Sequence, residues 1–162
     1  MSNLQLHRSA VASVCPPTEL DEAARNEMLR LMRVYYLNVK ETNFIRDLEA
    51  KDQVICLRDC SSTGSDSAKR DTAGRMVGFS TQKVFLHQVN GKRIRVLFSG
   101  DTVVSREHWN SPVLARAWGR LAMRLIAQSS EPMYWLLITK GYRTYRFLPL
   151  FFRSYAPACE VP

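Results

Sequence analysis

The chain has 162 residues, of which 46% are hydrophobic and 23% are charged, with seven glycines and seven prolines. These values are typical of one compact domain with a hydrophobic core, and they exclude a fibrous or disordered chain. No apolar run reaches the roughly 18 residues that a membrane-spanning helix needs, and the N-terminus lacks the pattern of a secretory signal. We therefore expect a cytoplasmic protein.

Positive charge is concentrated in the second half of the chain. Residues 1–71 carry 10 Lys and Arg against 11 Asp and Glu, a net charge of −1, whereas residues 72–162 carry 13 against 4, a net charge of +9. Such a charge distribution attracts an anionic partner. The partner is a phosphorylated cofactor, a nucleic acid or an anionic membrane, and charge alone does not choose among them.

The cysteines and histidines form no metal-binding pattern. Only Cys56 and Cys60 are close in sequence, and no second pair completes a tetrahedral zinc site. We therefore expect reduced thiols that are mostly buried or incidental, and no metal.

The first third of the chain predicts a loose arm, two helices and a strand. Residues 1–17 show no periodicity and end in two prolines, so we expect a flexible arm. A helix is predicted to begin at Thr18, with Asp21 as its capping partner, because apolar residues follow at spacings of three and four. Residues 44–50 predict a second, short helix, and residues 53–58 predict a strand.

A long hairpin is the clearest local pattern in the sequence. Residues 75–88 and 92–104 are two strand-like runs joined by Val89-Asn90-Gly91. An Asn-Gly pair accepts the positive φ angles of a tight hairpin turn. Because side chains alternate along a strand, Val77 and Phe79 are predicted to share one face of the sheet.

The following residues predict a helix and one more strand. Ser111 is placed to cap a helix with Pro112 in its first turn, and apolar residues then recur at spacings of three and four, namely Leu114, Trp118, Leu121 and Leu125. Residues 133–139 are almost all apolar and predict a buried strand. Three arginines, four residues apart, form a basic stripe elsewhere on the helix: Arg116, Arg120 and Arg124. The stripe is either a solvated face or a contact for an anion or an acidic partner.

The order of these elements is that of an antiparallel sheet followed by a strand–helix–strand crossover. The run VVSREHWNSPVLARAWGRLAMRLI, followed by YWLLITKGYRTYRFLPLFF, resembles a group of bacterial proteins in the GNAT acyltransferase superfamily, and NFIRDLEAKDQVICLRD with GRMVGFSTQ resembles the early GNAT strands. The resemblance implies an α/β (α+β) fold, with a mostly antiparallel twisted sheet, a β-α-β crossover and flanking helices, truncated at the C-terminus. We expect a single domain over residues 18–155, an arm over 1–17 and a tail over 156–162.

GNAT enzymes transfer an acyl group from coenzyme A to an amine, which attacks the thioester directly. The resemblance implies that acyl-CoA or acetyl-CoA lies in a V between residues 93–104 and 133–139. A loop and the N-terminus of the following helix would hold the pyrophosphate there. The residues assigned to the cofactor are Val103, Val104, Ser105, Arg106, Trp109, Asn110, Ser111 and Arg143. This loop lacks the glycines of the family pattern, which implies either a remodelled pocket or a lost cofactor.

Four residues are candidates for catalysis. Glu107 or His108 is placed to take a proton from the amine, since a general base needs a tunable pKa near the reacting centre. Tyr142 or Tyr145 matches the position of the tyrosine that protonates the leaving thiolate in many GNAT enzymes. The alternative interpretations are a pair of surface loop residues and an aromatic ring packed on the sheet.

Three classes of function remain open. The first is an acyl-CoA-dependent N-acyltransferase that acts on a small-molecule amine. The second is a GNAT-fold binding or interaction module without catalysis, favoured by the missing glycines and the short C-terminal part. The third is a binder of nucleic acid or an anionic membrane surface, for which TYRFLPLFFRSY supplies aromatic and arginine side chains. Aromatic residues near the end also predict a homodimer that covers a sheet edge.

Overall fold

The computed structural model describes residues 10–59, 74–138, 145, 148–149 and 152–157. In chain order, its elements are β1 (Ala10–Cys15), the 3-10 helix η1 (Pro17–Glu19), α1 (Glu22–Tyr35), α2 (Glu41–Glu49), β2 (Gln53–Asp59), β3 (Arg75–Val89), β4 (Lys92–Val104), the 3-10 helix η3 (Arg106–His108), α3 (Val113–Ala127) and β5 (Met133–Leu137). The predicted second helix and first strand are confirmed as α2 and β2.

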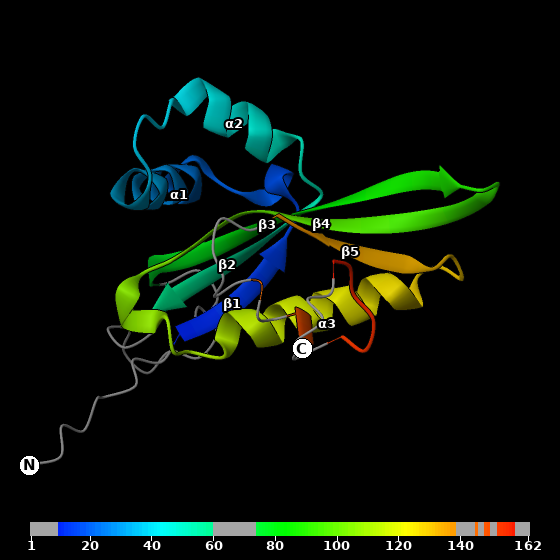
Figure 1. Ribbon diagram of the computed structural model, residues 1–162. Coiled ribbons are helices and arrows are strands. Elements are labelled where there is room, and N and C mark those ends of the chain that lie inside the picture. Colours follow the sequence, from blue (N-terminus) through cyan, green and yellow to red (C-terminus); the bar gives the residue numbers. More distant parts are fainter. Residues whose placement is uncertain (1–9, 60–73, 139–144, 146–147, 150–151, 158–162) are drawn as a thin grey trace, which may run out of the picture.

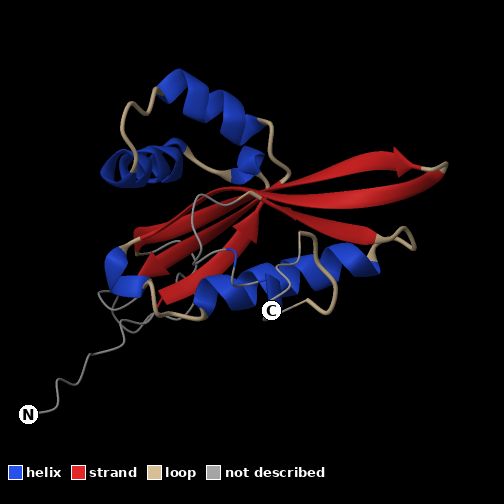
Figure 2. Ribbon diagram, viewed as in Figure 1, coloured by secondary structure: helices blue, strands red, loops and turns tan. Residues whose placement is uncertain are grey.

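The strands form one sheet with helices on both faces. The order across the sheet is β1-β2-β3-β4-β5, and every neighbouring pair is antiparallel except β4 and β5, which are parallel. Helices α1 and α2 lie on one face and α3 lies on the other (Figure 1), and the far end of the β3–β4 hairpin projects beyond them (Figure 2). The predicted α/β class with a mostly antiparallel sheet and a β-α-β crossover is confirmed.

The predicted hairpin is confirmed as β3 and β4. Asn90 and Gly91 close its turn with φ angles of 51° and 77°, the left-handed conformation that an Asn-Gly pair adopts readily. The turn therefore follows from two adjacent residues, without help from the rest of the chain.

Residues 10–15 correct the predicted N-terminal arm. They form β1, which pairs with β2 from Ala10–Asp59 to Cys15–Val54 and lies at the edge of the sheet. The apolar side chains of Ala10, Ala12 and Val14 pack against the cluster under α3. Alanine has little strand propensity and the segment is short, so pairing with β2 and packing under α3 contribute much of the stability of this strand.

Helix α1 begins later than predicted. Residues 17–19 form η1, and Asp21 rather than Thr18 caps the helix, because its Oδ1 accepts a hydrogen bond from the N–H of Ala24 at 2.7 Å. A carboxylate at this position satisfies a first-turn N–H and also interacts favourably with the positive end of the helix dipole.

Two hydrophobic clusters hold the helices on the sheet. Under α1 and α2, Met28 and Phe79 are fully buried, and the Phe44 ring meets the Phe79 ring edge to face with centroids 6.4 Å apart. Under α3, the buried residues include Val77 of β3 and Leu121 of α3. The predicted leucine face of α3 is therefore confirmed.

Val77 and Phe79 belong to different clusters, so the prediction that they share one face is wrong. The register between β2 and β3 shifts between Leu57 and Arg58, and this irregularity places the two side chains on opposite faces. A bulge depends on the partner strand, which the alternation of a single strand does not reveal.

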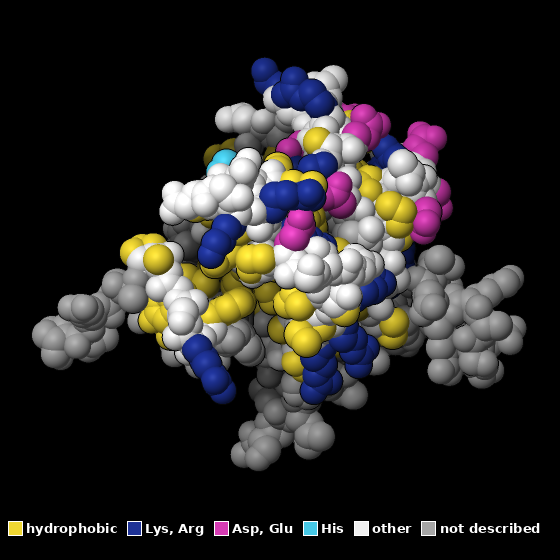
Figure 3. All heavy atoms as spheres, turned by 90° about the vertical axis from the view of Figure 1, so that its right-hand side faces the viewer, with side chains coloured by type: hydrophobic (Ala, Val, Ile, Leu, Met, Phe, Trp, Pro, Cys, Tyr) yellow, Lys and Arg dark blue, Asp and Glu magenta, His cyan; other side chains and the backbone are white. Residues whose placement is uncertain are grey.

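Strand β5 is a half-exposed edge rather than the predicted buried strand. Tyr134 and Leu136 are 58% and 47% exposed, whereas the ring of Trp135 packs against that of Trp118 with centroids 4.6 Å apart. Figure 3 looks at the hairpin end of the molecule and shows hydrophobic side chains exposed among Lys and Arg side chains. An exposed edge of this kind suits the predicted homodimer, which stays a prediction.

Two cysteines approach each other across β1 and β2. Cys56 is buried and Cys15 is half-buried, and both are free thiols. The hydrogen bond between them lowers the pKa of Cys15 and, together with burial, raises the pKa of Cys56. Cys60 and Cys159 lie outside the described residues.

We expect Gly78→Ala to lower the free energy of unfolding by about 1–3 kcal/mol, a typical cost of overpacking. A Cβ at this position would lie 2.9 Å from the carbonyl oxygen of Val103 and 3.2 Å from the Cα of Val104, so the β4 backbone would have to move. Gly119→Ala is the matched control, because a Cβ there meets nothing within 4 Å. Since alanine favours a helix interior, this control should gain up to about 1 kcal/mol. Urea denaturation of both variants measures the difference, and changes of the same sign would contradict the close approach of β3 and β4.

Candidate functional site

Strands β4 and β5 pair along only part of β4. Their parallel register runs from Arg95–Met133 to Ser99–Leu137. Strand β4 continues to Val104, where it is still paired with β3. Beyond Ser99, the edge of β4 that faces β5 therefore has no partner strand among the described residues. We call this region, beside residues 100–104, the β4–β5 opening.

A β-bulge lies where the pairing with β5 ends. The register shifts between Ser80 and Gln82 of β3, so that Gly100 and Asp101 of β4 both lie opposite Thr81. A Cβ at Gly100 would lie 2.6 Å from Oγ1 of Thr81, so any residue other than glycine would clash at this position of the bulge. A bulge bends its strand, and bulges are frequent beside active sites. This one marks the start of the β4–β5 opening.

A hydrogen-bonded network fixes β5 and α3 to the sheet at the same place. The hydroxyl of Ser99 accepts hydrogen bonds from the indole N–H groups of Trp118 at 3.1 Å and Trp135 at 3.0 Å. It donates to Oε1 of Gln82 at 2.7 Å, and the buried Gln82 amide donates to the hydroxyl of Ser80 at 2.7 Å. Buried polar networks whose members are satisfied hold one arrangement rigidly. The walls of the opening are therefore held by side chains from α3, β3, β4 and β5.

Helix α3 follows the end of β4 after a short loop. It begins at Val113, so Pro112 rather than Ser111 is its N-cap residue, and Pro112 makes no side-chain hydrogen bond. Ser111 still accepts the N–H of Val113, at a long 3.4 Å. The N–H groups of Leu114 and Ala115 have no acceptor within the helix, and the first turn holds no acidic residue. This N-terminus therefore favours an anion.

The loop between β4 and α3 is fixed at several points. Ser105 is buried, and the N–H of Arg106 donates to the hydroxyl of Tyr35 in α1 at 3.1 Å. The indole N–H of Trp109 donates to the carbonyl oxygen of Val104 at 2.7 Å. The guanidinium of Arg106 lies 5.8 Å from the centroid of the Trp109 ring, a cation–π contact. An exposed arginine thus lies on an aromatic ring at the end of β4.

Comparisons with known proteins identify the fold. No protein-family model and no curated protein sequence matches the chain. Among solved structures, the chain is similar to a ribosomal-protein-alanine N-acetyltransferase from Brucella melitensis biovar Abortus 2308. The TM-score is 0.60 at 12% identity, over 95% of this chain and 98% of that chain. The chain has the GNAT fold.

Two further structures agree with this fold. An aminoglycoside 6'-N-acetyltransferase from Acinetobacter haemolyticus gives a TM-score of 0.56 at 15% identity, over 93% of this chain and 97% of that chain. An integron cassette protein from the mobile metagenome of V. cholerae gives a TM-score of 0.59 at 13% identity, over 95% of this chain and 91% of that chain. The predicted resemblance to GNAT proteins is confirmed, and at these identities it establishes the fold alone.

The residues that the sequence assigned to the cofactor have different surroundings in the structure. The side chains of Val103 and Val104 pack into the clusters on opposite faces of the sheet, so only their backbone groups can meet a ligand. Asn110 is exposed, and Arg143 lies outside the described residues. Arg106 and Trp109 contact each other after the end of β4, and Ser111 accepts the N–H of Val113 at the start of α3.

Glu107 and His108, the residues predicted as the general base, both have partners on other strands, and their role stays a prediction. His108 is buried, and its Nε2 lies 3.8 Å from Oδ2 of Asp59 at the end of β2. Oε2 of Glu107 lies 3.8 Å from Nη2 of Arg75 at the start of β3. Both partners belong to strands on the other side of β4 from β5. The turn of η3 therefore directs both side chains away from the opening.

The two candidate tyrosines have different outcomes. Tyr142 lies outside the described residues. The hydroxyl of Tyr145 donates to the carbonyl oxygen of Pro157 at 2.7 Å, and its ring meets that of Tyr155 at 6.5 Å between centroids. A contact between the rings of Phe152 and Trp135 places Phe152 against β5. The role of either tyrosine as a proton donor stays a prediction.

Asp101 is the carboxylate that the sequence did not single out. It is half-buried, belongs to the bulge, and follows shortly after Ser99, the last β4 residue that pairs with β5. Its position becomes evident only from the strand register, because no motif surrounds it. Among the titratable residues of β4, Asp101 is the one closest in sequence to Ser99, where the opening begins.

Two features are absent from the residues that the structure describes, which are 10–59, 74–138, 145, 148–149 and 152–157. Within those ranges, no three His, Cys, Asp or Glu side chains are grouped so as to hold a metal ion. No helix of the same ranges is long and apolar enough to cross a membrane.

Proposed function

We propose that the protein is an acyl-CoA-dependent N-acyltransferase that binds acetyl-CoA or a longer acyl-CoA at the β4–β5 opening. One observation carries this proposal: among the described residues, β4 has no pairing with β5 after Ser99, where a bulge lies, and the loop of residues 105–112 then leads to the N-terminus of α3. The GNAT fold of the chain supports it, and so does the excess of positive charge in the second half of the sequence.

The residues at the opening fit a phosphorylated co-substrate. The N–H groups of Leu114 and Ala115 and the exposed guanidinium of Arg106 offer donors to phosphate oxygens. The unpaired edge of β4 offers backbone donors and acceptors to the amide groups of a pantetheine chain. The loop has no glycine, so side chains and the helix terminus would hold the phosphates in place of a glycine-lined loop.

Asp101 is the general base that the geometry favours. A carboxylate at the bulge, beside the bound acyl thioester, would remove the proton from the attacking amine. Acyl-CoA supplies the thioester, and the amine is a small molecule of a class that the structure does not specify.

We expect Arg106→Ala to weaken acetyl-CoA binding by about tenfold, since one charge-assisted phosphate contact contributes roughly this much. Isothermal titration calorimetry with acetyl-CoA and with a long-chain acyl-CoA measures the effect. Arg30→Ala is the matched control, because Arg30 is also an exposed arginine and its neighbour is Glu27 on α1. No heat with either ligand, from a folded sample, would exclude the proposal.

The second candidate is a GNAT-fold module that binds a ligand at the same opening without catalysis. The observation that favours it is the orientation of Glu107 and His108, which leaves the loop without a base at the opening. Saturable acyl-CoA binding without acylation of any amine in a broad panel would support this candidate.

A further inference from the structure

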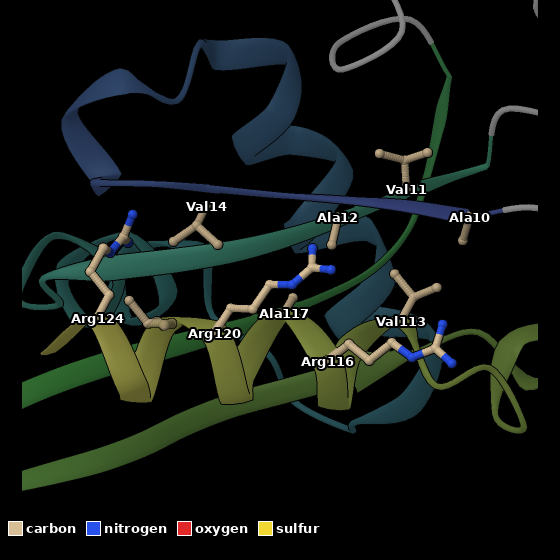
Figure 4. Close-up of a pocket in the computed structure, with 10 residues that line it drawn as sticks. Ala10, Val11, Ala12, Val14, Val113, Arg116, Ala117, Arg120 and Arg124 are labelled. Atoms are coloured by element: carbon tan, nitrogen blue, oxygen red, sulfur yellow. The ribbon is translucent and has the colours of Figure 1, made fainter. Parts of the chain in front are cut away.

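A groove lies between β1 and α3, at the opposite edge of the sheet from the β4–β5 opening. Its volume is about 510 Å³, and small apolar side chains such as Ala12 and Ala117 line it. One side of the groove is formed by the basic stripe of α3, which consists of Arg116, Arg120 and Arg124. Figure 4 shows these arginines extending from successive turns of α3 on the side that faces β1.

The strand beside this groove has an unpaired edge. Strand β1 pairs with β2 along its whole length, and no other described strand pairs with it. Backbone N–H and C=O groups along the outer edge of a strand form a template for a further strand. The sequence of β1, AVASVC, has no proline, lysine or other charged residue, which are the usual means of blocking such an edge.

The three arginines are exposed and form no ion pair with any described residue. Other arginines of the chain are paired, such as Arg58 with Glu27 at 2.8 Å and Arg93 with Glu131 at 2.9 Å. Like charges in a row repel one another, and no described residue forms an ion pair with these three, so an anionic partner would relieve the repulsion. The row therefore points to a partner of complementary charge.

The spacing of the arginines matches an extended chain. Residues four apart on a helix are separated by about 6 Å along its axis. Alternate residues of a strand, which share one face, are separated by about 6.6 Å. Three successive arginines of α3 can thus meet three carboxylates at every second position of a peptide that lies along β1.

We propose that this groove binds an extended acidic segment of a partner protein, which adds a strand to the edge of β1. Carboxylates at alternate positions of that segment pair with Arg116, Arg120 and Arg124. A nucleic acid would also meet the arginines, but it could not extend the sheet by adding a strand to the β1 edge. The proposal does not depend on acyl transfer, because the β1 edge and the arginine side chains would hold the peptide. The groove does share the first turn of α3 with the proposed phosphate contact, since Val113 and Arg116 line it.

The test is fluorescence anisotropy of the full chain with a labelled peptide in which glutamate and threonine alternate. We expect saturable binding that weakens with added salt and falls at least about tenfold in the triple variant Arg116→Gln, Arg120→Gln, Arg124→Gln. The matched control is the triple variant Arg46→Gln, Lys92→Gln, Arg93→Gln, which loses the same charge from other elements. Circular dichroism checks that both variants are folded.

Three results would overturn the proposal. The first is equal binding by the two triple variants, or no saturable binding by the wild-type chain. The second is equal affinity for a peptide of the same composition whose glutamates are consecutive, because strand pairing requires alternation. The third is tighter binding of single-stranded DNA of matched charge that is lost in the Arg116, Arg120 and Arg124 variant, which would assign the groove to nucleic acid.

Discussion

Replacement of Phe79 by alanine is expected to lower the free energy of unfolding by about 3–5 kcal/mol, the usual cost of removing a buried aromatic ring. Phe79 is 0% exposed and lies in the cluster between the sheet and helices α1 and α2. Its ring meets that of Phe44 edge to face, so the substitution also removes an aromatic pair. The alanine variant would leave a cavity where the Phe79 ring lies. The strands and helices around that ring are closely packed, so they can fill the cavity only in part. Urea denaturation followed by circular dichroism measures the loss.

Phe85→Ala on the same strand is the matched control. Phe85 is 45% exposed, and its ring contacts that of Phe98 at 6.3 Å between centroids. The expected loss is about 1 kcal/mol or less, because a half-exposed ring leaves no enclosed cavity. Equal losses for the two variants would contradict the division of β3 into a buried half and an exposed half.

The parts of the fold that could be predicted from the sequence are those that local chemistry determines. The hairpin turn follows from Asn90 and Gly91, and helix α3 follows from its leucine spacing. The parts that were missed depend on partners distant in sequence. Strand β1 is stabilised by pairing with β2, and the separation of Val77 from Phe79 results from a bulge between two strands.

The residues of the candidate site also differ in whether they could be predicted from local sequence. The order of the elements predicted the loop before α3 correctly, and Arg106 and Trp109 do lie together at the end of β4. Sequence could not predict the direction of Glu107 and His108, because their neighbours are Arg75 and Asp59 on other strands. The Ser99 network and the position of Asp101 likewise emerge only once the register of β3, β4 and β5 is known.

Asp101→Asn is expected to lower the rate of acyl transfer about 100-fold or more, as is usual when a general base is removed, and to leave acetyl-CoA binding unchanged. Asparagine has the shape of aspartate but cannot accept a proton from an ammonium group, so the substitution tests the chemistry rather than the fold. The measurement is release of the coenzyme A thiol with a panel of small amines, alongside calorimetric titration of acetyl-CoA.

Glu107→Gln is the control that separates the two candidate carboxylates. Glu107 lies beside Arg75, on the other side of β4 from β5, so this variant should retain full turnover. Loss of turnover in Glu107→Gln with normal turnover in Asp101→Asn would reverse the assignment of the base. If the wild-type chain binds acetyl-CoA and neither it nor any variant acylates an amine, the binding-module candidate is favoured, because the opening would then hold a ligand with no base acting on it. Turnover that depends on Asp101 alone would instead establish that the bulge which ends the β4–β5 pairing also carries the catalytic carboxylate.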